Sequence, residues 1–347
     1  MNGPTIIRST RASRFGLLGI AIVFGVLAGA PWWAGTADLR LITEFMFYLA
    51  LASMWNLLAG YAGLISVGQH AYVGLGGDVL FSCALFFGLN PLLAVPVAGV
   101  AGALISIPVA ALVFRLRGPY FAIGTWVVAE VFRLAAGNMS SVGGGSGLSL
   151  PIAVMKALGR KSEREMLIYF AALLLCAGAV ALVYLLLRSR LGLALTAIRD
   201  NEVASSSLGV RIGRVKTIIY VVTAAVTAMI GCLIFVTKLR ITPDAAFSVN
   251  DWTVFVIFIV VIGGIGTIEG PIIGTLLFFL LREFLADLGP LYLIILGVVA
   301  IAIMLWSRKG LWGLIVQRYD FSLFPVGYRV RSDRPPPTNE RTTHGRH

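Results

Sequence analysis

Ionisable side chains inside apolar runs are the residues of this chain whose type and position could do chemistry. Asp78 lies in the middle of one run, and Glu130 and Arg133 lie three residues apart on a later one. A charged group at membrane depth is costly, so it marks a solute pathway, a proton relay or a structural pair. Their spacing puts Glu130 and Arg133 on one helix face and favours a structural pair. For Asp78, which has no visible partner, the functional and structural interpretations both stay open.

Several other chemistries are excluded or disfavoured by the sequence. No Gly-x-x-x-x-Gly-Lys-Ser/Thr is present, so we expect this chain to bind no ATP and no other cofactor of its own. No Ser–His–Asp set or carboxylate pair stands out, which disfavours a membrane-embedded enzyme. The three histidines are far apart, so no metal site is expected. The three cysteines are isolated in apolar runs and are predicted to be packing residues: Cys83, Cys176 and Cys232.

Composition indicates which elements must position these residues. Of 347 residues, 58% are hydrophobic and only 13% are charged. A membrane-spanning helix needs about 20 apolar residues, so the chain can form up to roughly ten spans with little left for a soluble core. The apolar runs are continuous and do not alternate, which disfavours an outer-membrane barrel. The predicted fold class is therefore an all-α integral membrane protein of about ten transmembrane helices, surrounded by lipid.

Ten apolar runs can be traced along the chain. They are Phe15–Trp33, Leu41–Ala59, His70–Phe87, Leu92–Phe114, Tyr120–Ala136, Met166–Leu187, Thr217–Val236, Trp252–Ile265, Ile272–Leu285 and Leu291–Trp306. The first run resembles a signal peptide, because arginines precede it and Ala28-Gly29-Ala30 lies near its end. Pro31 disfavours cleavage there, so we expect an uncleaved span.

The distribution of basic residues predicts the topology. If the N-terminus is cytoplasmic and the runs alternate, the inner segments carry 14 Lys and Arg near the membrane and the outer ones carry 7. This bias predicts a multi-pass protein with both termini in the cytoplasm, although the basic loop 137–165 then lies outside. The net charge of +12 is thus a topology signal, and no nucleic-acid partner is expected.

The apolar runs and the distribution of basic residues divide the chain into three parts. We expect a cytoplasmic arm at 1–14, a transmembrane domain at 15–306 with a cytoplasmic loop at 188–216, and a cytoplasmic tail at 307–347. The end of the tail contains Pro335-Pro336-Pro337 and scattered Arg, with too few apolar residues to form a core, so the tail is predicted to be largely disordered.

Two glycine-rich segments lie at membrane depth, Gly60–Gly77 and Gly263–Gly274. Irregular backbone survives in hydrocarbon only if it is buried in protein or lines a wet cavity, so the clustering favours broken helices near a pathway. Each glycine taken singly also fits close helix packing, and Gly266, Gly270 and Gly274 would form one stripe on a helix. Pro271 argues against an unbroken helix there. The candidate pathway residues are Gly63, Gly68, Gln69, His70, Asp78, Gly263, Gly264, Gly266, Glu269 and Gly270.

The loop Arg188–Lys216 is long enough to form a helix lying along the membrane. Asp200 or Asn201 could cap a second short helix, and Gly209 could end it. The simplest interpretation is a solvated connector that carries positive-inside charges. However, Glu202-x-Ala204 followed by Gly209 resembles the cytoplasmic EAA-type signature of ABC importer permeases.

The resemblance extends along most of the chain. Six segments in order are similar to the LivM-type permeases of branched-chain amino acid importers: Gly60–Gly76, Arg115–Thr125, Gly143–Leu148, Arg190–Gly209, Ile262–Gly274 and Arg308–Gly313. Each segment alone is weakly specific, but six in order are specific. Gln69-His70 and Gly77-Asp78 depart from the small and aromatic residues of the family pattern.

The resemblance implies the function and its partners. It implies an inner-membrane permease of a bacterial ABC importer that moves Leu, Ile or Val inward. The expected partners are a LivH-type second permease, two LivG/LivF-type ATPases that bind the ATP, and a periplasmic or tethered substrate-binding protein. The residues expected to couple to the ATPases are Arg199, Asp200, Glu202, Ala204, Leu208 and Gly209. A urea or short-amide permease is the alternative within the family, and an ion-coupled secondary transporter is the alternative outside it.

Overall fold

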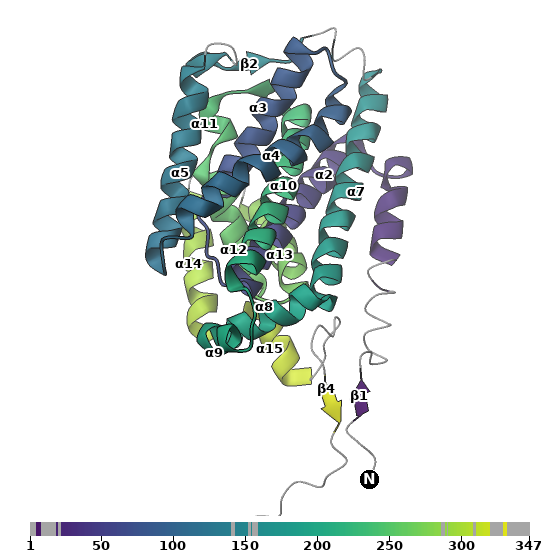
Figure 1. Ribbon diagram of the computed structural model, residues 1–347. Helices are drawn as coiled ribbons and strands as arrows, with labels where there is room; N and C mark the ends of the chain where they lie inside the picture. The colour runs from purple at the N-terminus through teal and green to yellow at the C-terminus, as the bar shows by residue number, and fades with distance from the viewer. Residues whose placement is uncertain are drawn as a thin grey trace, which may run out of the picture.

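Long apolar helices make up most of the structure. The computed structural model describes residues 5–7, 19, 22–139, 143–151, 154, 159–285, 289, 291–307, 310–319 and 329–331. The long helices pack side by side in a bundle (Figure 1). Their bounds are α2 (Thr36–Asn56, continued by the π-helical turn η2, Leu57–Tyr61), α3 (His70–Phe86), α4 (Pro91–Val113), α5 (Pro119–Asn138), α7 (Lys161–Arg188), α10 (Ile212–Lys238), α12 (Phe255–Gly263), α13 (Glu269–Leu285) and α14 (Leu291–Trp306).

The ten predicted runs correspond one for one to helices in the described residues. Seven stretches are long and apolar enough to cross a membrane, among them Thr36–Tyr61 and Pro243–Gly263. Three runs give shorter helices, namely Ile22–Trp32, α3 and α13. The start of the first run, 15–18, lies outside the described residues. The eighth element differs from its prediction: it begins at Pro243 with α11 (Pro243–Ala246) and the π-helical turn η5 (Asn250–Val254), and ends at Gly263.

Helix α10 lies at the centre of the bundle, against α2, α3, α4 and α7. Small residues permit this packing. A Cβ at Gly76 of α3 would overlap the carbonyl oxygen of Ala228, and a Cβ at Gly231 would overlap that of Val73. Helices in lipid associate through such close backbone approaches, which explains part of the early glycine-rich segment as packing. The three cysteines are unpaired and buried, as expected of packing residues.

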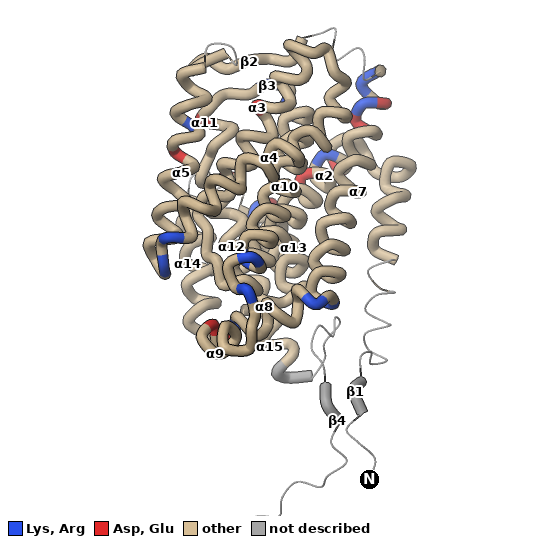
Figure 2. Tube along the Cα trace, in the orientation of Figure 1, with Lys and Arg blue, Asp and Glu red and all other residues tan. Residues whose placement is uncertain are grey.

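The two ends of the bundle differ (Figures 1 and 2). At one end, here called the α8 end, lie α8 (Arg190–Asp200), α9 (Glu202–Ser207) and α15 (Gly310–Tyr319). Strand β1 (Thr5–Ile7) also lies at this end and pairs antiparallel with β4 (Arg329–Arg331). At the opposite end, here called the β2 end, β2 (Leu148–Ser149) pairs antiparallel with β3 (Arg240–Ile241).

Two stretches of the segment 307–347, which was predicted to be a largely disordered tail, are ordered. Residues 310–319 form α15, which packs against α12, α13 and α14. Gly310 has a φ of +70° and lies against the backbone of Gly264, while Trp312 is buried. Residues 310–319 are mostly apolar, and the contact with Gly264 holds them against the bundle. Residues 329–331 form β4, and the remainder of the tail is almost entirely outside the described residues.

Candidate functional site

The loop between α7 and α10 folds into two capped helices, as predicted. The Ser189 hydroxyl accepts a hydrogen bond from the Leu191 amide (3.1 Å) at the start of α8. Asn201, and not Asp200, caps α9, because its side-chain oxygen accepts from the Ala204 amide (3.0 Å). Gly209 has a φ of +83°, the left-handed conformation in which a helix commonly ends. Local capping signals therefore fix this loop in a defined shape.

The helix pair presents apolar side chains outward. Val203 is 77% exposed and Leu208 is 82% exposed, while Ala204 is also exposed. Glu202 forms an ion pair with Lys216 (3.0 Å), so it is held by its own chain. The opposite side of α8 buries Leu195 and Ile198. Exposed apolar residues beyond the membrane-spanning part of a bundle are typical of a protein-binding surface.

A break in the helices separates α12 from α13. Gly264 and Gly266 have φ values of +134° and +76°, which side-chain-bearing residues rarely adopt. The backbones of α12 and α13 are in direct contact next to the break. A Cβ at Gly263 would overlap the carbonyl oxygen of Gly270, and a Cβ at Gly274 would overlap the carbonyl oxygen of Ile259. The predicted broken helix is confirmed. Gly266 lies in the turn while Gly270 and Gly274 lie on α13, so the alternative of one stripe on an unbroken helix does not apply.

Asn56 at the end of α2 holds this break in place. Its side-chain nitrogen donates to the carbonyl of Thr267 (2.7 Å), and its side-chain oxygen accepts from the amide of Gly266 (2.8 Å). The side chain is only 1% exposed. Sequence reasoning missed Asn56, and the available signal was that it is the only amide in the run Leu41–Ala59.

Arg199 of α8 reaches the same break. A Cβ built at Gly266 would lie 2.9 Å from Nη1 of Arg199 and 3.2 Å from the carbonyl oxygen of Gly60. The buried Glu269 begins α13 directly after the break, and both its charge and that of Arg199 act on the Tyr61 hydroxyl. We call Asn56, Gly60, Arg199, Gly266 and Thr267 the Asn56 junction. It joins Arg199, a loop residue predicted for coupling, to Gly266, a predicted pathway residue.

The earlier glycine-rich segment also breaks the helix, between η2 and α3. Gly63 has a φ of +68°, and a Cβ at Gly68 would overlap the backbone of Thr125 in α5. Backbone groups of the non-helical segment form hydrogen bonds with side chains. The Trp55 indole donates to the carbonyl oxygen of Ser66 (2.8 Å), and the Val67 amide donates to the Thr125 hydroxyl (3.1 Å). Irregular backbone is thus tolerated because protein satisfies it.

Two polar side chains follow this break in the interior. Nδ1 of His70 lies 3.0 Å from the hydroxyl of Thr253 in η5. The Gln69 side-chain oxygen accepts from Thr227 (3.4 Å), and its buried side-chain nitrogen has no hydrogen-bond partner among the described residues. These two predicted pathway residues are therefore buried side by side and contact α10 and η5.

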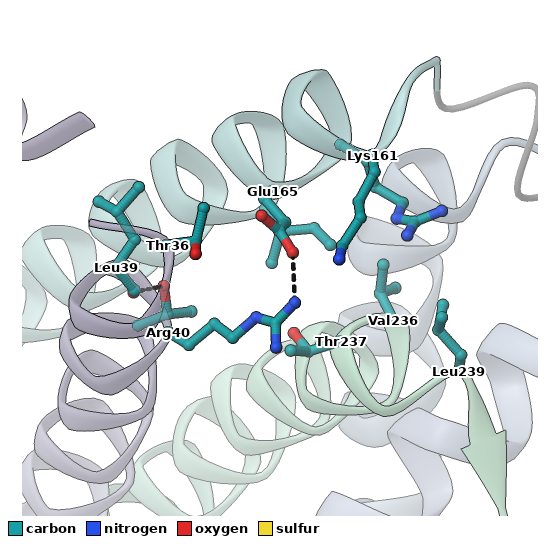
Figure 3. A pocket seen from close by; sticks show the side chains of 11 residues that line it. Thr36, Leu39, Arg40, Lys161, Glu165, Val236, Thr237 and Leu239 are labelled. Atoms are coloured by element: carbon teal, nitrogen blue, oxygen red, sulfur yellow. Dashed lines mark hydrogen bonds and ion pairs between the residues drawn. The ribbon is translucent and has the colours of Figure 1, made fainter. Parts of the chain in front are cut away.

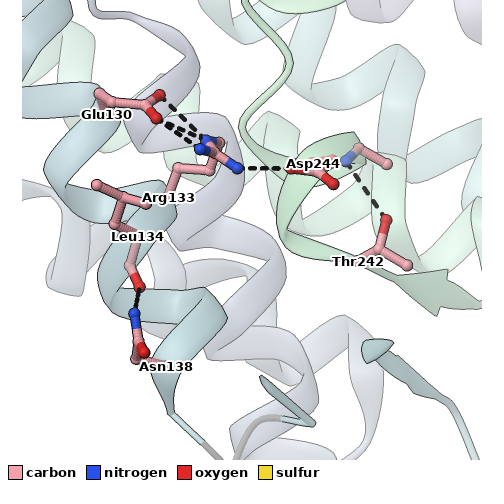
Figure 4. A network of polar contacts seen from close by, with 7 residues as sticks. Glu130, Arg133, Leu134, Asn138, Thr242 and Asp244 are labelled. Atoms are coloured by element: carbon pink, nitrogen blue, oxygen red, sulfur yellow. Dashed lines mark hydrogen bonds and ion pairs between the residues drawn. The ribbon is translucent and has the colours of Figure 1, made fainter. Parts of the chain in front are cut away.

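The other candidate ionisable residues lie apart from the Asn56 junction. Asp78 is partly buried on α3 and makes no hydrogen bond or ion pair within the described ranges. Glu130 and Arg133 form the predicted pair (2.6 Å), and Arg133 also bridges to Asp244 of α11 (2.6 Å; Figure 4). The bridge fastens α5 to α11 near the β2 end, which supports the structural interpretation of the pair.

Two adjoining cavities open among the helices toward the β2 end. One, of about 310 Å³, lies between α2, α7 and α10, and Figure 3 shows the Arg40–Glu165 ion pair (2.6 Å) across it. The other, of about 370 Å³, is called here the Lys238 cavity. It is lined by Arg40, Thr43, Glu44, Phe47, Tyr48, Ile234, Thr237, Lys238, Asp251, Trp252, Phe255, Arg282 and Tyr292. Sequence reasoning identified neither cavity, because their walls come from helices far apart in the chain.

Comparison with known proteins is consistent with this architecture. Residues 39–305 match a family described as the permease component of branched-chain amino acid transport systems. The chain is 30% identical to the high-affinity branched-chain amino acid transport system permease protein LivM of Escherichia coli over 304 residues, 80% of this chain and 70% of that protein. It is 28% identical to the Salmonella typhimurium protein of the same name, over 89% of this chain and 77% of that protein. No solved structure matches the chain.

Proposed function

Because this chain belongs to the family of permease components of branched-chain amino acid transport systems, we propose that it conducts leucine, isoleucine or valine inward across a bacterial inner membrane. It is a multi-pass membrane protein and a transport permease subunit. In the proposal, the α8 end faces the cytoplasm together with both termini. ATP hydrolysed on partner subunits supplies the energy, and this chain binds no cofactor of its own.

The Asn56 junction is the observation that supports this proposal most directly. Arg199 lies on α8, whose neighbour α9 presents Val203 and Leu208 to solvent. The same Arg199 lies against the break at Gly266. A partner that shifts the capped helix pair would therefore displace the break, and with it the ends of α12 and α13. This is the kind of connection that coupling between ATP hydrolysis and a pathway requires.

The proposed partners follow the surfaces of the chain. Two LivG/LivF-type ATPases would provide the nucleotide site that the sequence lacks, and one of them would bind the exposed residues of α9. A LivH-type permease would complete the channel, and a periplasmic or tethered binding protein would deliver the solute at the β2 end. The candidate pathway runs past Gly63, Gly68, Gln69, His70, Asp78 and the break at Gly263–Gly270.

Transport in liposomes tests the energy source and the solute together. We expect the two permeases, two ATPases and binding protein to accumulate leucine only when ATP and binding protein are both present. Uptake driven by a proton or sodium gradient without ATP would support a secondary transporter instead. ATP-driven uptake of urea but not leucine would assign the chain to the short-amide branch.

A substitution on α9 tests the docking surface. Leu208→Asp places a charge where an apolar contact with the ATPase is proposed, so we expect ATPase binding to weaken about tenfold or more while membrane insertion is unchanged. Leu193→Asp is the matched control, because Leu193 is exposed on α8 but lies outside α9. Equal ATPase affinity for Leu208→Asp and the native chain would contradict the assignment of this surface.

A further inference from the structure

The Lys238 cavity combines charges of both signs with aromatic walls. Its volume of about 370 Å³ falls within the range of small-molecule sites, roughly 300–1,000 Å³. Lys238 is the last residue of α10, and β3 begins two residues later, so the cavity lies toward the β2 end. It is thus at the opposite end from the Asn56 junction.

The charges that line the cavity are mostly paired. Arg40 forms an ion pair with Glu165 (2.6 Å), and Arg282 forms one with Glu44 (2.7 Å). Within the ranges that the structure describes, Lys238 and Asp251 have no ion-pair partner. The charges of Asp251 and Glu44 act on Lys238 without coming within ion-pair distance, so the cavity retains one cation and one anion that lack a direct partner in the described part of the chain.

The rest of the wall is aromatic. The Lys238 ammonium lies 4.6 Å from the centre of the Trp252 ring, which holds it over an aromatic face. Trp252 stacks on Tyr48 with ring centroids 6.2 Å apart, and Phe255 lies beside Tyr48. This arrangement provides an apolar surface next to the two unpaired charges.

We propose that the Lys238 cavity binds a free α-amino acid with an aliphatic side chain, with Lys238 facing its carboxylate, Asp251 facing its ammonium group and Tyr48, Trp252 and Phe255 contacting its side chain. A ligand with both charges gives each of the two protein charges a direct partner, whereas urea or a simple anion gives a charged partner to at most one. The site deepens the proposed function, on which it rests, by assigning this subunit a substrate contact of its own. Selectivity then does not reside only in the binding protein.

Direct binding to the complex tests the site. The assembled permeases and ATPases, without binding protein, are titrated with radiolabelled leucine. We expect saturable binding of leucine. Leucinamide and 4-methylvalerate, which each lack one of its two charges, should compete at least tenfold less well than unlabelled leucine. Equal competition by either analogue would overturn the proposal.

Substitutions identify the residues. Lys238→Met and Asp251→Asn should each weaken leucine binding about ten- to hundredfold, the effect of losing a hydrogen bond between charged groups. Lys161→Met and Glu283→Gln are the matched controls, because Lys161 lines the neighbouring cavity and Glu283 is exposed on α13. Unchanged leucine affinity in both Lys238→Met and Asp251→Asn would overturn the site.

Two further arms separate the remaining explanations. A zwitterionic lipid headgroup has the same charges, so binding is repeated in vesicles of phosphatidylglycerol and of phosphatidylethanolamine. Leucine affinity that falls at least tenfold in phosphatidylethanolamine would assign the cavity to lipid and overturn the proposal, and equal affinity supports it. ATP-driven leucine uptake by the native complex, measured in parallel, keeps the proposed function separate. Normal uptake by the native complex, with unchanged leucine affinity in both Lys238→Met and Asp251→Asn, overturns the site alone. Absent uptake by the native complex overturns the proposed function.

Discussion

The two ends of the bundle are built in opposite ways. At the Asn56 junction, backbones touch at glycines and a buried amide uses both of its polar atoms on the neighbouring turn. In the Lys238 cavity, by contrast, side chains surround open volume and two charges have no ion-pair partner among the described residues. A tightly packed contact transmits displacement, whereas an open polar cavity selects by chemistry. We therefore expect backbone geometry to limit function at the α8 end and charge to limit it at the β2 end.

The largest expected effect comes from filling a backbone contact at the α8 end. Gly263→Val would place side-chain atoms on the carbonyl of Gly270, so α12 and α13 must separate. We expect a loss of stability above about 3 kcal/mol, beyond ordinary overpacking, and no assembled complex. Gly297→Val is the matched control, because nothing lies within 4 Å of that position. Size-exclusion chromatography and thermal unfolding in detergent distinguish the two, and assembly of both variants would contradict the proposed rigidity.

Removing the side-chain amide of Asn56 should have the next largest effect. Asn56→Ala leaves the Gly266 amide and the Thr267 carbonyl without their partner, which we expect to cost about 2 kcal/mol and to reduce transport. Asn138→Ala serves as the control, since Asn138 is exposed and bonds only to its own helix. The measurement is the melting temperature together with leucine uptake. Equal behaviour of the two variants would show that the break holds its shape without α2.

A smaller effect is expected at the end of α9. Gly209→Val would strain a backbone with a φ of +83° by about 1–2 kcal/mol, although no neighbour obstructs the side chain. We expect the ATPase activity stimulated by loaded binding protein to fall about tenfold. Gly209→Asn should retain most of the activity, because asparagine tolerates this conformation. Loss of activity in both variants would indicate that space, and not the backbone angle, limits the position.

The smallest effect is expected in the bridge between α5 and α11. Glu130→Gln removes one partner of Arg133, but Asp244 still binds the guanidinium, and the Glu130 side chain is 43% exposed. We expect a change in stability of at most about 1 kcal/mol and normal uptake. A large loss of uptake at unchanged melting temperature would instead place Glu130 in the pathway and end its structural interpretation.

The sequence predicted the features that depend on local pattern. Apolar runs long enough to cross a membrane became helices, and Asn201 and Gly209 acted as the caps that their residue types indicate. Contacts between distant segments were beyond such reasoning. Asn56 binds a turn 210 residues later, and Gly310 at the start of α15 packs against Gly264, so neither contact shows in a local pattern.

The span between Asn56 and its partner also has a consequence during protein synthesis. A ribosome adds roughly 5–20 residues per second, so the amide waits on the order of 10–40 s before Gly266 exists. Throughout that interval the Asn56 side chain lacks the two partners that it has in the folded protein. Its final position is secured only when the break has been made, and Gly310 packs against Gly264 later still.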